Sequence, residues 1–325
     1  MSPAKNKQSS SVKPKCATKA GALRPGDRVG IVAPASRPEG PHTVAAIEKL
    51  VTGMGFVPVF GKHVLSIHGY MAGKDDERLE DLNGFIRDKN IRGIFCITGG
   101  YGSLRILEGV DYEGLMRDPK VVVGSDENTC LLLAINKMAS LPVFHGFNLD
   151  MIKSDRARDE FLYAATQNKV LPPVEAGRSY PADFVYSPIR GKASGTTLGG
   201  NLNALFSLMG TNYQPDFKDT VLLIEERNER NDIIERWITS LFLSGELNLV
   251  NGIAFGNFDT CGTRSASNML SLEDILHQTL AKLQKPACFG MSFGQSEHCR
   301  VTPIGIEAEF DSESGKLTFK EAALL

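Results

Sequence analysis

The segment 120–131 places polar side chains at a point where a nucleophile can be presented. An apolar run of three valines ends at Gly124, Ser125 and Asp126 follow, and an apolar helical pattern begins at Leu131. This order predicts a buried strand, a tight turn and the start of a helix. In α/β proteins such a turn can carry a nucleophile while helix amides hold an oxyanion. Ser125 and Asp126 are therefore the first candidate catalytic residues.

Carboxylates and histidines elsewhere in the chain could act as acids or bases. Glu225 and Glu226 directly follow the apolar run 221–224. A carboxylate at the end of a strand can act as a base or orient one, although a solvated charge is the commoner role. His145 ends an apolar run and His298 lies in a polar loop. A lone histidine is more often structural than catalytic, so these two are weaker candidates.

A glycine-rich turn provides a candidate anion-binding loop. Gly99, Gly100, Tyr101 and Gly102 follow a predicted strand and precede a helical pattern that contains Arg105. Glycines in this arrangement let backbone amides approach an anion closely. The turn matches neither a Walker loop nor the dinucleotide-binding pattern. On spacing alone, a plain connection between a strand and a helix is the commoner explanation.

Composition limits the possible partners and location. The 325 residues contain 42% hydrophobic and 23% charged residues, with a net charge of −2. This balance argues against nucleic acid as a partner, and no apolar stretch is long enough to span a membrane. The six cysteines lack metal-ligand spacing, so we expect reduced thiols and a cytoplasmic location. No motif in the chain calls for a cofactor, and we expect none. Residues 1–20 contain no apolar signal segment and predict a disordered tail.

Strand and helix patterns alternate through the first half of the chain. We therefore expect an α/β protein whose amino-terminal domain, residues 21–166, is a doubly wound parallel sheet. Residues 167–190 are rich in Pro, Tyr and Ala and predict a linker. Residues 191–325 predict a smaller, β-rich carboxyl-terminal domain, with a short helix at 201–209 and an antiparallel hairpin at 303–319.

Several motifs, in order, resemble those of the LD-carboxypeptidase family, the serine peptidases that include muramoyl-tetrapeptide carboxypeptidase and the microcin C self-immunity peptidase. The resemblance covers roughly residues 23–319. The segments that carry it are Leu23–Pro34, Tyr70–Arg78, Gly99–Gly102 with Arg105, Pro119–Leu131, His145-Gly146, Gly199–Leu202, Gly210–Asp216, Ile224–Glu226, and Phe293-Gly294 with Pro303. Each motif is weak alone, but their number and order identify the chain as a member of the family.

The resemblance implies a two-domain fold, a homodimer and an active site between the domains. Family members use a Ser–His–Glu triad without a metal, and commonly release D-alanine from a cytoplasmic tetrapeptide during peptidoglycan recycling. The resemblance places the oxyanion hole at the glycine motif and at the amide after the serine. The implied substrate or oxyanion residues are Gly99, Gly100, Tyr101, Glu127 and Arg105.

The chain departs from the family at two of the three catalytic positions. In the ungapped alignment of the turn, Asp126 takes the place of the serine and Ser125 the place of an aromatic residue. Gln295 stands where the family has histidine, and Glu225 is retained. A carboxamide cannot accept a proton, so Gln295 cannot activate a hydroxyl group. These residues predict a diverged hydrolase with an altered triad, acting on a small peptide-like substrate.

Three other interpretations of the same residues remain open. A local shift of one residue would make Ser125 the nucleophile, with His298 as base and Glu225 as the orienting acid. Asp126 and Glu225 could instead perform acid/base chemistry across the cleft, or bind a divalent ion with Glu127 and His298. Finally, the protein could be a non-catalytic protein that binds a peptide or muropeptide in a retained pocket.

Overall fold

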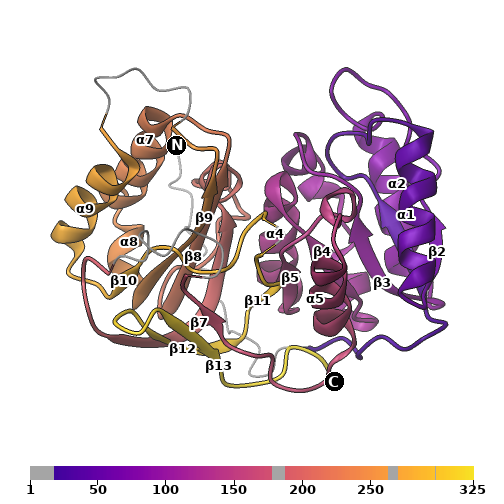
Figure 1. Ribbon diagram of the computed structural model, residues 1–325. Helices are drawn as coiled ribbons and strands as arrows, with labels where there is room; N and C mark the ends of the chain where they lie inside the picture. Colours follow the sequence, from indigo (N-terminus) through magenta and orange to yellow (C-terminus); the bar gives the residue numbers. More distant parts are fainter. Residues whose placement is uncertain (1–17, 178–186, 263–269, 297) are drawn as a thin grey trace, which may run out of the picture.

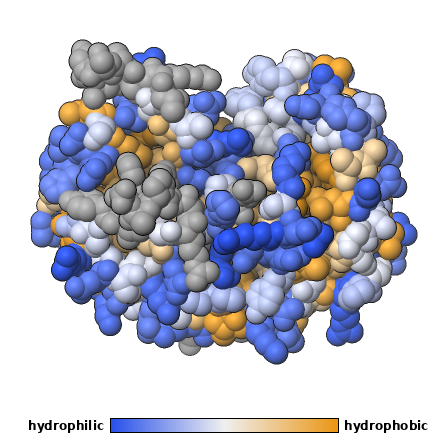
Figure 2. Space-filling model, in the orientation of Figure 1, coloured by the Kyte–Doolittle hydropathy of each residue, from blue (hydrophilic) through white to orange (hydrophobic). Residues whose placement is uncertain are grey.

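The computed structural model describes residues 18–177, 187–262, 270–296 and 298–325. The described chain forms two halves that lie side by side, each built around one β-sheet (Figure 1). Hydrophilic residues dominate the face seen in Figure 2, with apolar residues in scattered patches, as is normal for a water-exposed surface. Among the described residues, no helix is long and apolar enough to cross a membrane.

The first half contains a six-stranded sheet in the order β11-β5-β4-β3-β1-β2. The strands β1 to β5 pair in parallel, and β11 pairs antiparallel to β5. Strand β4 is buried along its whole length, which explains its run of three valines. The strands are β1 (Arg28–Val32), β2 (Val57–Phe60), β3 (Ile91–Cys96), β4 (Val121–Gly124), β5 (Val143–His145) and β11 (Thr302–Ile304).

Helices cover this sheet and connect its parallel strands, as the alternating pattern predicted. The helix α4 packs against β5 of the first sheet and β7 of the second, so it lies between the two halves (Figure 1). Its apolar residues are buried nearly all round, because both sheets contact it. The elements are α1 (Pro41–Gly53), α2 (Asp75–Arg87), η1 (Ser103–Gly109), α3 (Tyr112–Arg117), η2 (Asp126–Asn128), α4 (Thr129–Ala139), η3 (Leu149–Met151) and α5 (Asp155–Thr166).

The second half contains a seven-stranded mixed sheet in the order β10-β9-β8-β7-β12-β13-β6. The strands β7 to β10 are parallel, whereas β12, β13 and β6 pair antiparallel. The predicted hairpin is present as β12 and β13. The strands are β6 (Val174–Glu175), β7 (Lys192–Asn201), β8 (Thr220–Arg227), β9 (Gly252–Asp259), β10 (Ala287–Cys288), β12 (Glu307–Asp311) and β13 (Lys316–Phe319).

Among the described residues of this half, four helices accompany the second sheet: α6 (Leu202–Ser207), α7 (Asn231–Leu243), α8 (Glu246–Leu249) and α9 (Leu272–Leu283). The sequence prediction contained α6 but neither α7 nor α9. The apolar stripe of α7 was available as a signal, since Ile234, Ile238 and Leu241 are spaced for one helical face and are buried. The half is β-rich as predicted, with more helix than expected.

The chain crosses between the halves near the predicted domain boundaries. Strand β11 comes from the predicted carboxyl-terminal domain but extends the first sheet, and β6 lies within the predicted linker. Most of the predicted tail, residues 1–17, lies outside the described residues. Ala20, which the prediction counted in the tail, is buried, and its carbonyl accepts a hydrogen bond from the Leu325 amide at 2.9 Å. The boundaries near 21, 167 and 191 stay predictions.

Candidate active site

Asp126 stands at the apex of the turn between β4 and α4. Strand β4 ends at Gly124, Ser125 is extended at φ −159°, and Asp126 has a left-handed backbone with φ 58°. A residue other than glycine in this region costs about 1–2 kcal/mol, and such strain is often found at functional sites. A strained residue between a strand and a helix is the geometry in which α/β hydrolases expose a nucleophile.

The Asp126 carboxylate lies against the glycine-rich turn. Its Oδ2 accepts a hydrogen bond from the Gly100 amide at 2.8 Å. Asp126 also packs against Gly99 so closely that no side chain fits there: a Cβ atom built on Gly99 would lie 2.0 Å from Asp126 Oδ2. Asp126 also lines a cavity of about 490 Å³ together with Arg227, Asn228, Thr260 and Gln295. Asp126 therefore accepts the hydrogen bond of a loop amide that could otherwise bind a substrate oxyanion.

Ser125 lies behind the turn and is fully buried. Its hydroxyl is 3.8 Å from the Met151 sulfur, and its amide donates to Asn148 Oδ1 at 3.0 Å. The Asn148 side chain also donates to the Ser125 carbonyl at 3.3 Å and accepts from Asn128 Nδ2 at 3.0 Å. Asn148 thus holds both backbone groups beside the strained residue. No motif in the sequence indicated this role for Asn148.

Side chains hold the glycine-rich turn in a fixed position. The Tyr101 amide donates to Ser36 Oγ at 3.1 Å, and the Gly102 amide donates to Glu127 Oε1 at 2.9 Å. Buried Arg78 donates to the Gly102 carbonyl at 2.8 Å. Burial raises the pKa of the Glu127 carboxyl, and the hydrogen bond that it accepts from the Gly102 amide opposes that rise. Glu127 therefore fixes the loop instead of facing open solvent.

Two other predicted substrate residues, Tyr101 of this turn and Arg105 just after it, are exposed. Arg105 is exposed and forms an ion pair with Asp75 at 2.7 Å. The exposed Tyr101 ring packs edge-to-face on Tyr70, with ring centroids 5.2 Å apart. Because its guanidinium already has a carboxylate partner, Arg105 contributes mainly to the support of the loop.

Glu225 is fully buried at the end of β8 and is contacted from both halves. Gln295 Nε2 lies 3.2 Å from each carboxyl oxygen of Glu225, and His145 Nε2 lies 3.6 Å from Oε1. Burial raises the pKa of Glu225 well above its ordinary value, and Glu226 adds to the rise. Burial lowers the pKa of His145 to about 4. Burial therefore favours the protonated carboxyl of Glu225 and the neutral imidazole of His145.

Glu226 points to the start of α6 and is also buried. Its carboxylate accepts hydrogen bonds from Asn201 Nδ2 at 2.9 Å, the Asn203 amide at 3.0 Å and the Arg227 amide at 2.8 Å. Burial nevertheless raises its pKa to about 7. The prediction left open whether Glu225 and Glu226 were solvated charges, and the structure buries both.

Gln295 lines two cavities, and His298 is not among the described residues that line either of them. The His298 side chain is exposed, and its carbonyl accepts a hydrogen bond from Arg156 at 3.4 Å. Among the described residues, no group of three or more His, Cys, Asp or Glu side chains is arranged to hold a metal ion.

Arg227, which the sequence prediction missed, lines the cavity with Asp126. The alternation of side chains along a strand could have indicated it, since Glu225 and Arg227 are two residues apart.

Comparisons with known proteins identify the family. Sequence models of the LD-carboxypeptidase N-terminal and C-terminal domains match residues 29–146 and 194–310. A probable murein peptide carboxypeptidase of Bacillus subtilis is 32% identical over 293 residues, which cover 90% of this chain and 91% of that protein. The chain belongs to the LD-carboxypeptidase family.

Solved structures share the fold. The microcin C7 self-immunity protein, known from Escherichia coli, superposes with a TM-score of 0.82 at 22% identity, covering 95% of this chain and 100% of that chain. Muramoyltetrapeptide carboxypeptidase from Oxalobacter formigenes has a TM-score of 0.78 at 21% identity, covering 90% and 97%. At this level of identity, the likeness extends to the fold alone.

The contact between Asp126 and Gly99 can be tested by a double-mutant cycle. Gly99→Ala should lower the free energy of unfolding by about 2 kcal/mol, because the new methyl group collides with Asp126. In an Asp126→Gly background the same change should cost much less, since glycine tolerates the left-handed backbone and removes the side chain. Urea unfolding of the four proteins measures the coupling. Gly84→Ala is the control, because nothing lies within 4 Å of its added Cβ. Equal costs in both backgrounds would contradict the contact.

Burial of Glu226 should appear in the pH dependence of stability. Its pKa is about 7 in the folded protein and ordinarily 4.5, so between these values the folded state holds a proton that the unfolded chain has released. The free energy of unfolding should therefore fall as pH rises through this interval, by roughly 3 kcal/mol from this group.

Substitution separates this effect from that of His145, whose lowered pKa makes stability rise with pH between about 4 and 6.5. Glu226→Gln should remove the Glu226 contribution, so that the variant loses less stability than the natural protein between pH 5 and 8. Glu48→Gln, at an exposed site, should leave the slope unchanged. Denaturant unfolding across this pH range gives the slopes. Identical slopes for all three proteins would rule out a buried, protonated Glu226.

Proposed function

We propose that this protein is a carboxypeptidase-like hydrolase that cleaves an amide bond in a small peptide-like substrate, either a muropeptide or a peptidyl nucleotide. The family supports the reaction class. The substrate range is suggested by a relative named a murein peptide carboxypeptidase and by the microcin C7 self-immunity protein, whose structure is known in complex with aspartyl sulfamoyl adenosine. One observation carries the proposal for this chain: Asp126 is at the strained apex and shares a cavity with Gln295.

Asp126 acts as a base on water in this proposal and does not attack the substrate itself. Attack by a carboxylate on an amide would give an anhydride, which is a poor intermediate near neutral pH. A water molecule bound between Asp126 and the substrate carbonyl can instead lose its proton to Asp126 as it adds to the carbonyl carbon. Asp126 then returns that proton to the departing nitrogen, so that the cycle closes with one water consumed.

Gln295, which stands where the family has histidine, has a different task under this mechanism. Gln295 cannot move a proton, but its carboxamide is bound to Glu225 and faces the cavity that contains Asp126. A carboxamide fixed in this way can orient the attacking water. Burial raises the pKa of Glu225 and so favours its protonated form.

A non-catalytic binding protein is the second candidate. The observation in its favour is the hydrogen bond from the Gly100 amide to Asp126, because this amide is then not free for the oxyanion of a substrate. Such a protein would bind the peptide without turning it over. The homodimer, the cytoplasmic location and a role in peptidoglycan recycling remain predictions, and sedimentation of the purified chain would test the first of them.

Activity assays on two neighbouring substitutions test the proposed role of Asp126. The purified chain is incubated with a muramoyl tetrapeptide and with aspartyl sulfamoyl adenosine, and release of the free amino acid is measured. Asp126→Asn should lower turnover on the order of a thousandfold, because the amide keeps the size of the side chain but cannot accept a proton. Ser125→Ala should retain nearly full activity.

The two variants also discriminate between the alternatives. Loss of activity in Ser125→Ala but not in Asp126→Asn would overturn the proposal in favour of a shifted serine triad. Binding of either compound by the natural protein without any turnover would favour the binding protein. Covalent labelling of Ser125 by a fluorophosphonate would rule out both the Asp126 mechanism and the binding protein.

A further inference from the structure

The connection that carries Gln295 passes from one half of the molecule to the other. Before it, the Asn257 amide donates to the Phe293 carbonyl at 2.8 Å, which ties the chain to β9 of the second sheet. After it, β11 begins at Thr302 and extends the first sheet by pairing with β5. Residues 294–301 span these two points. The position of Gln295 therefore depends on how both halves hold a short connection.

Backbone hydrogen bonds tie the two ends of this connection together. The Arg300 amide donates to the Ser292 carbonyl at 2.8 Å, and the Cys299 amide donates to the Ser296 carbonyl at 2.9 Å. Arg300 therefore lies beside the start of the connection, and its backbone partner comes three residues before Gln295. A displacement of Arg300 is for this reason passed on to the segment that carries Gln295.

One face of helix α5, in the first half, contacts the connection at two points. Arg156 Nη2 donates to the His298 carbonyl at 3.4 Å. Glu160 faces Arg300, whose Nη1 lies 3.4 Å from each carboxylate oxygen. Arg156 and Glu160 are four residues apart in one helix, so they lie on the same side of it. The half that carries Asp126 therefore also holds the connection that carries Gln295.

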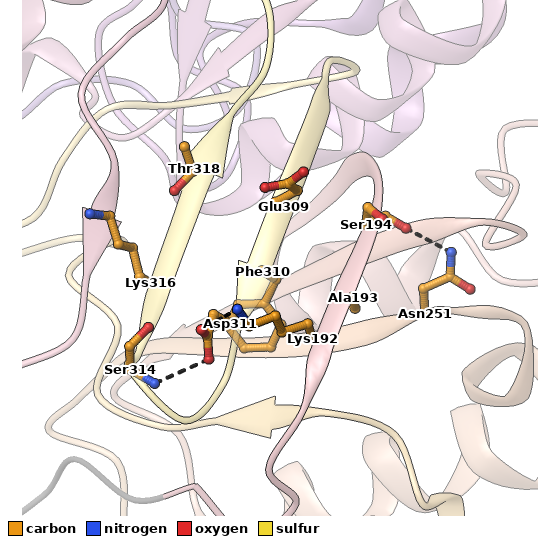
Figure 3. A pocket seen from close by; sticks show the side chains of 10 residues that line it. All are labelled: Lys192, Ala193, Ser194, Asn251, Glu309, Phe310, Asp311, Ser314, Lys316 and Thr318. Carbon is orange, nitrogen blue, oxygen red and sulfur yellow. Dashed lines mark hydrogen bonds and ion pairs between the residues drawn. The ribbon is translucent and has the colours of Figure 1, made fainter.

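The pair of Glu160 with Arg300 is partly shielded from water, since the two side chains are 21% and 19% exposed. A hollow on the exposed face of the second sheet provides a contrast (Figure 3). There, Lys192 lies 3.6 Å from Asp311, but the Lys192 side chain is 83% exposed. Water and salt weaken an exposed ion pair more than a partly buried one. The pair on α5 is therefore better suited to hold a loop in one position.

We propose that Glu160 and Arg300 form an ionic clasp that positions Gln295 in the cavity it shares with Asp126. The clasp keeps Gln295 Nε2 at 3.2 Å from the carboxyl oxygens of Glu225, so that the carboxamide can orient the attacking water. Neither Glu160 nor Arg300 is among the described residues that line the cavity, so both are positioning residues that act through the loop. The inference rests on the proposed function, because it concerns the task of Gln295 in that reaction.

The side-chain amide signals of Gln295 report its position without any need for turnover. Nitrogen-15 correlation spectra of the natural protein contain these signals, and Gln295→Ala identifies them by their loss. Arg300→Met and Glu160→Met should each shift them, because either change removes one charge of the clasp. Arg300→Lys keeps the charge and should shift them less.

The matched control is Lys192→Met, which breaks the exposed ion pair in the hollow of Figure 3 and should leave the Gln295 signals in place. Signals that do not move in Arg300→Met and Glu160→Met would overturn the proposal. Signals that move as far in Lys192→Met would overturn it as well.

Turnover separates positioning of Gln295 from a general effect on stability. With whichever of the two compounds above the natural protein hydrolyses, Arg300→Met should lower kcat about tenfold at a temperature where the variant stays folded, because a displaced group loses its effect on the reacting atoms. In a Gln295→Ala background the same change should have no further effect on kcat. An equal loss in both backgrounds would overturn the proposal. A protein whose Gln295 signals respond as expected but which hydrolyses nothing would refute the proposed function alone.

Discussion

The hydrogen bond from the Gly100 amide to the Asp126 carboxylate, 2.8 Å long, joins the two loops on which the site depends. One loop follows β3 and the other follows β4, and these strands are neighbours in a parallel sheet. The carboxyl ends of parallel strands meet at one edge, so the sheet brings the loops together. The bond in turn constrains Asp126 at φ 58°, a conformation that would otherwise be unfavourable.

Buried polar groups support this contact from both sides. Asn148 holds the backbone of Ser125, while Glu127 and Arg78 hold the amide and the carbonyl of Gly102. Each of these groups is buried and would be costly without its partner, so the partners fix one arrangement of the loops. The positions of Gly100 and Asp126 are therefore set by the protein before any ligand arrives. Preorganisation of this kind favours both catalysis and tight binding.

The interface between the halves contains buried acids, and burial raises the pKa of Glu225 and of Glu226. Glu225 is buried between Gln295 and His145, and burial favours its protonated form as it favours the neutral form of His145. A histidine in place of Gln295 could share a proton with Glu225, whereas the carboxamide can only donate a hydrogen bond or accept one. The proposed mechanism therefore assigns proton transfer to Asp126, which lines the cavity.

Much of this site followed from the sequence, because strand, turn and helix signals are local. The run of valines, Gly124 and the apolar pattern of α4 predicted the turn that carries Asp126. The pairing of Gln295 with Glu225 could be expected only from the resemblance to the family, since 70 residues separate them in the chain. The role of Asn148 could not be predicted, because it depends on hydrogen bonds to the backbone of Ser125, which lies 23 residues earlier in the chain. The helix α7, by contrast, has a local signal, because Ile234, Ile238 and Leu241 form an apolar stripe with helical spacing.

NMR of the Gly100 amide shows whether Asp126 or Ser125 faces the glycine-rich turn. Asp126→Ala removes the acceptor of the hydrogen bond, so the Gly100 amide proton should move clearly upfield, whereas Ser125→Ala should leave its position unchanged. A Gly100 amide proton that does not move in Asp126→Ala, or that moves equally in Ser125→Ala, would contradict the hydrogen bond between the two loops.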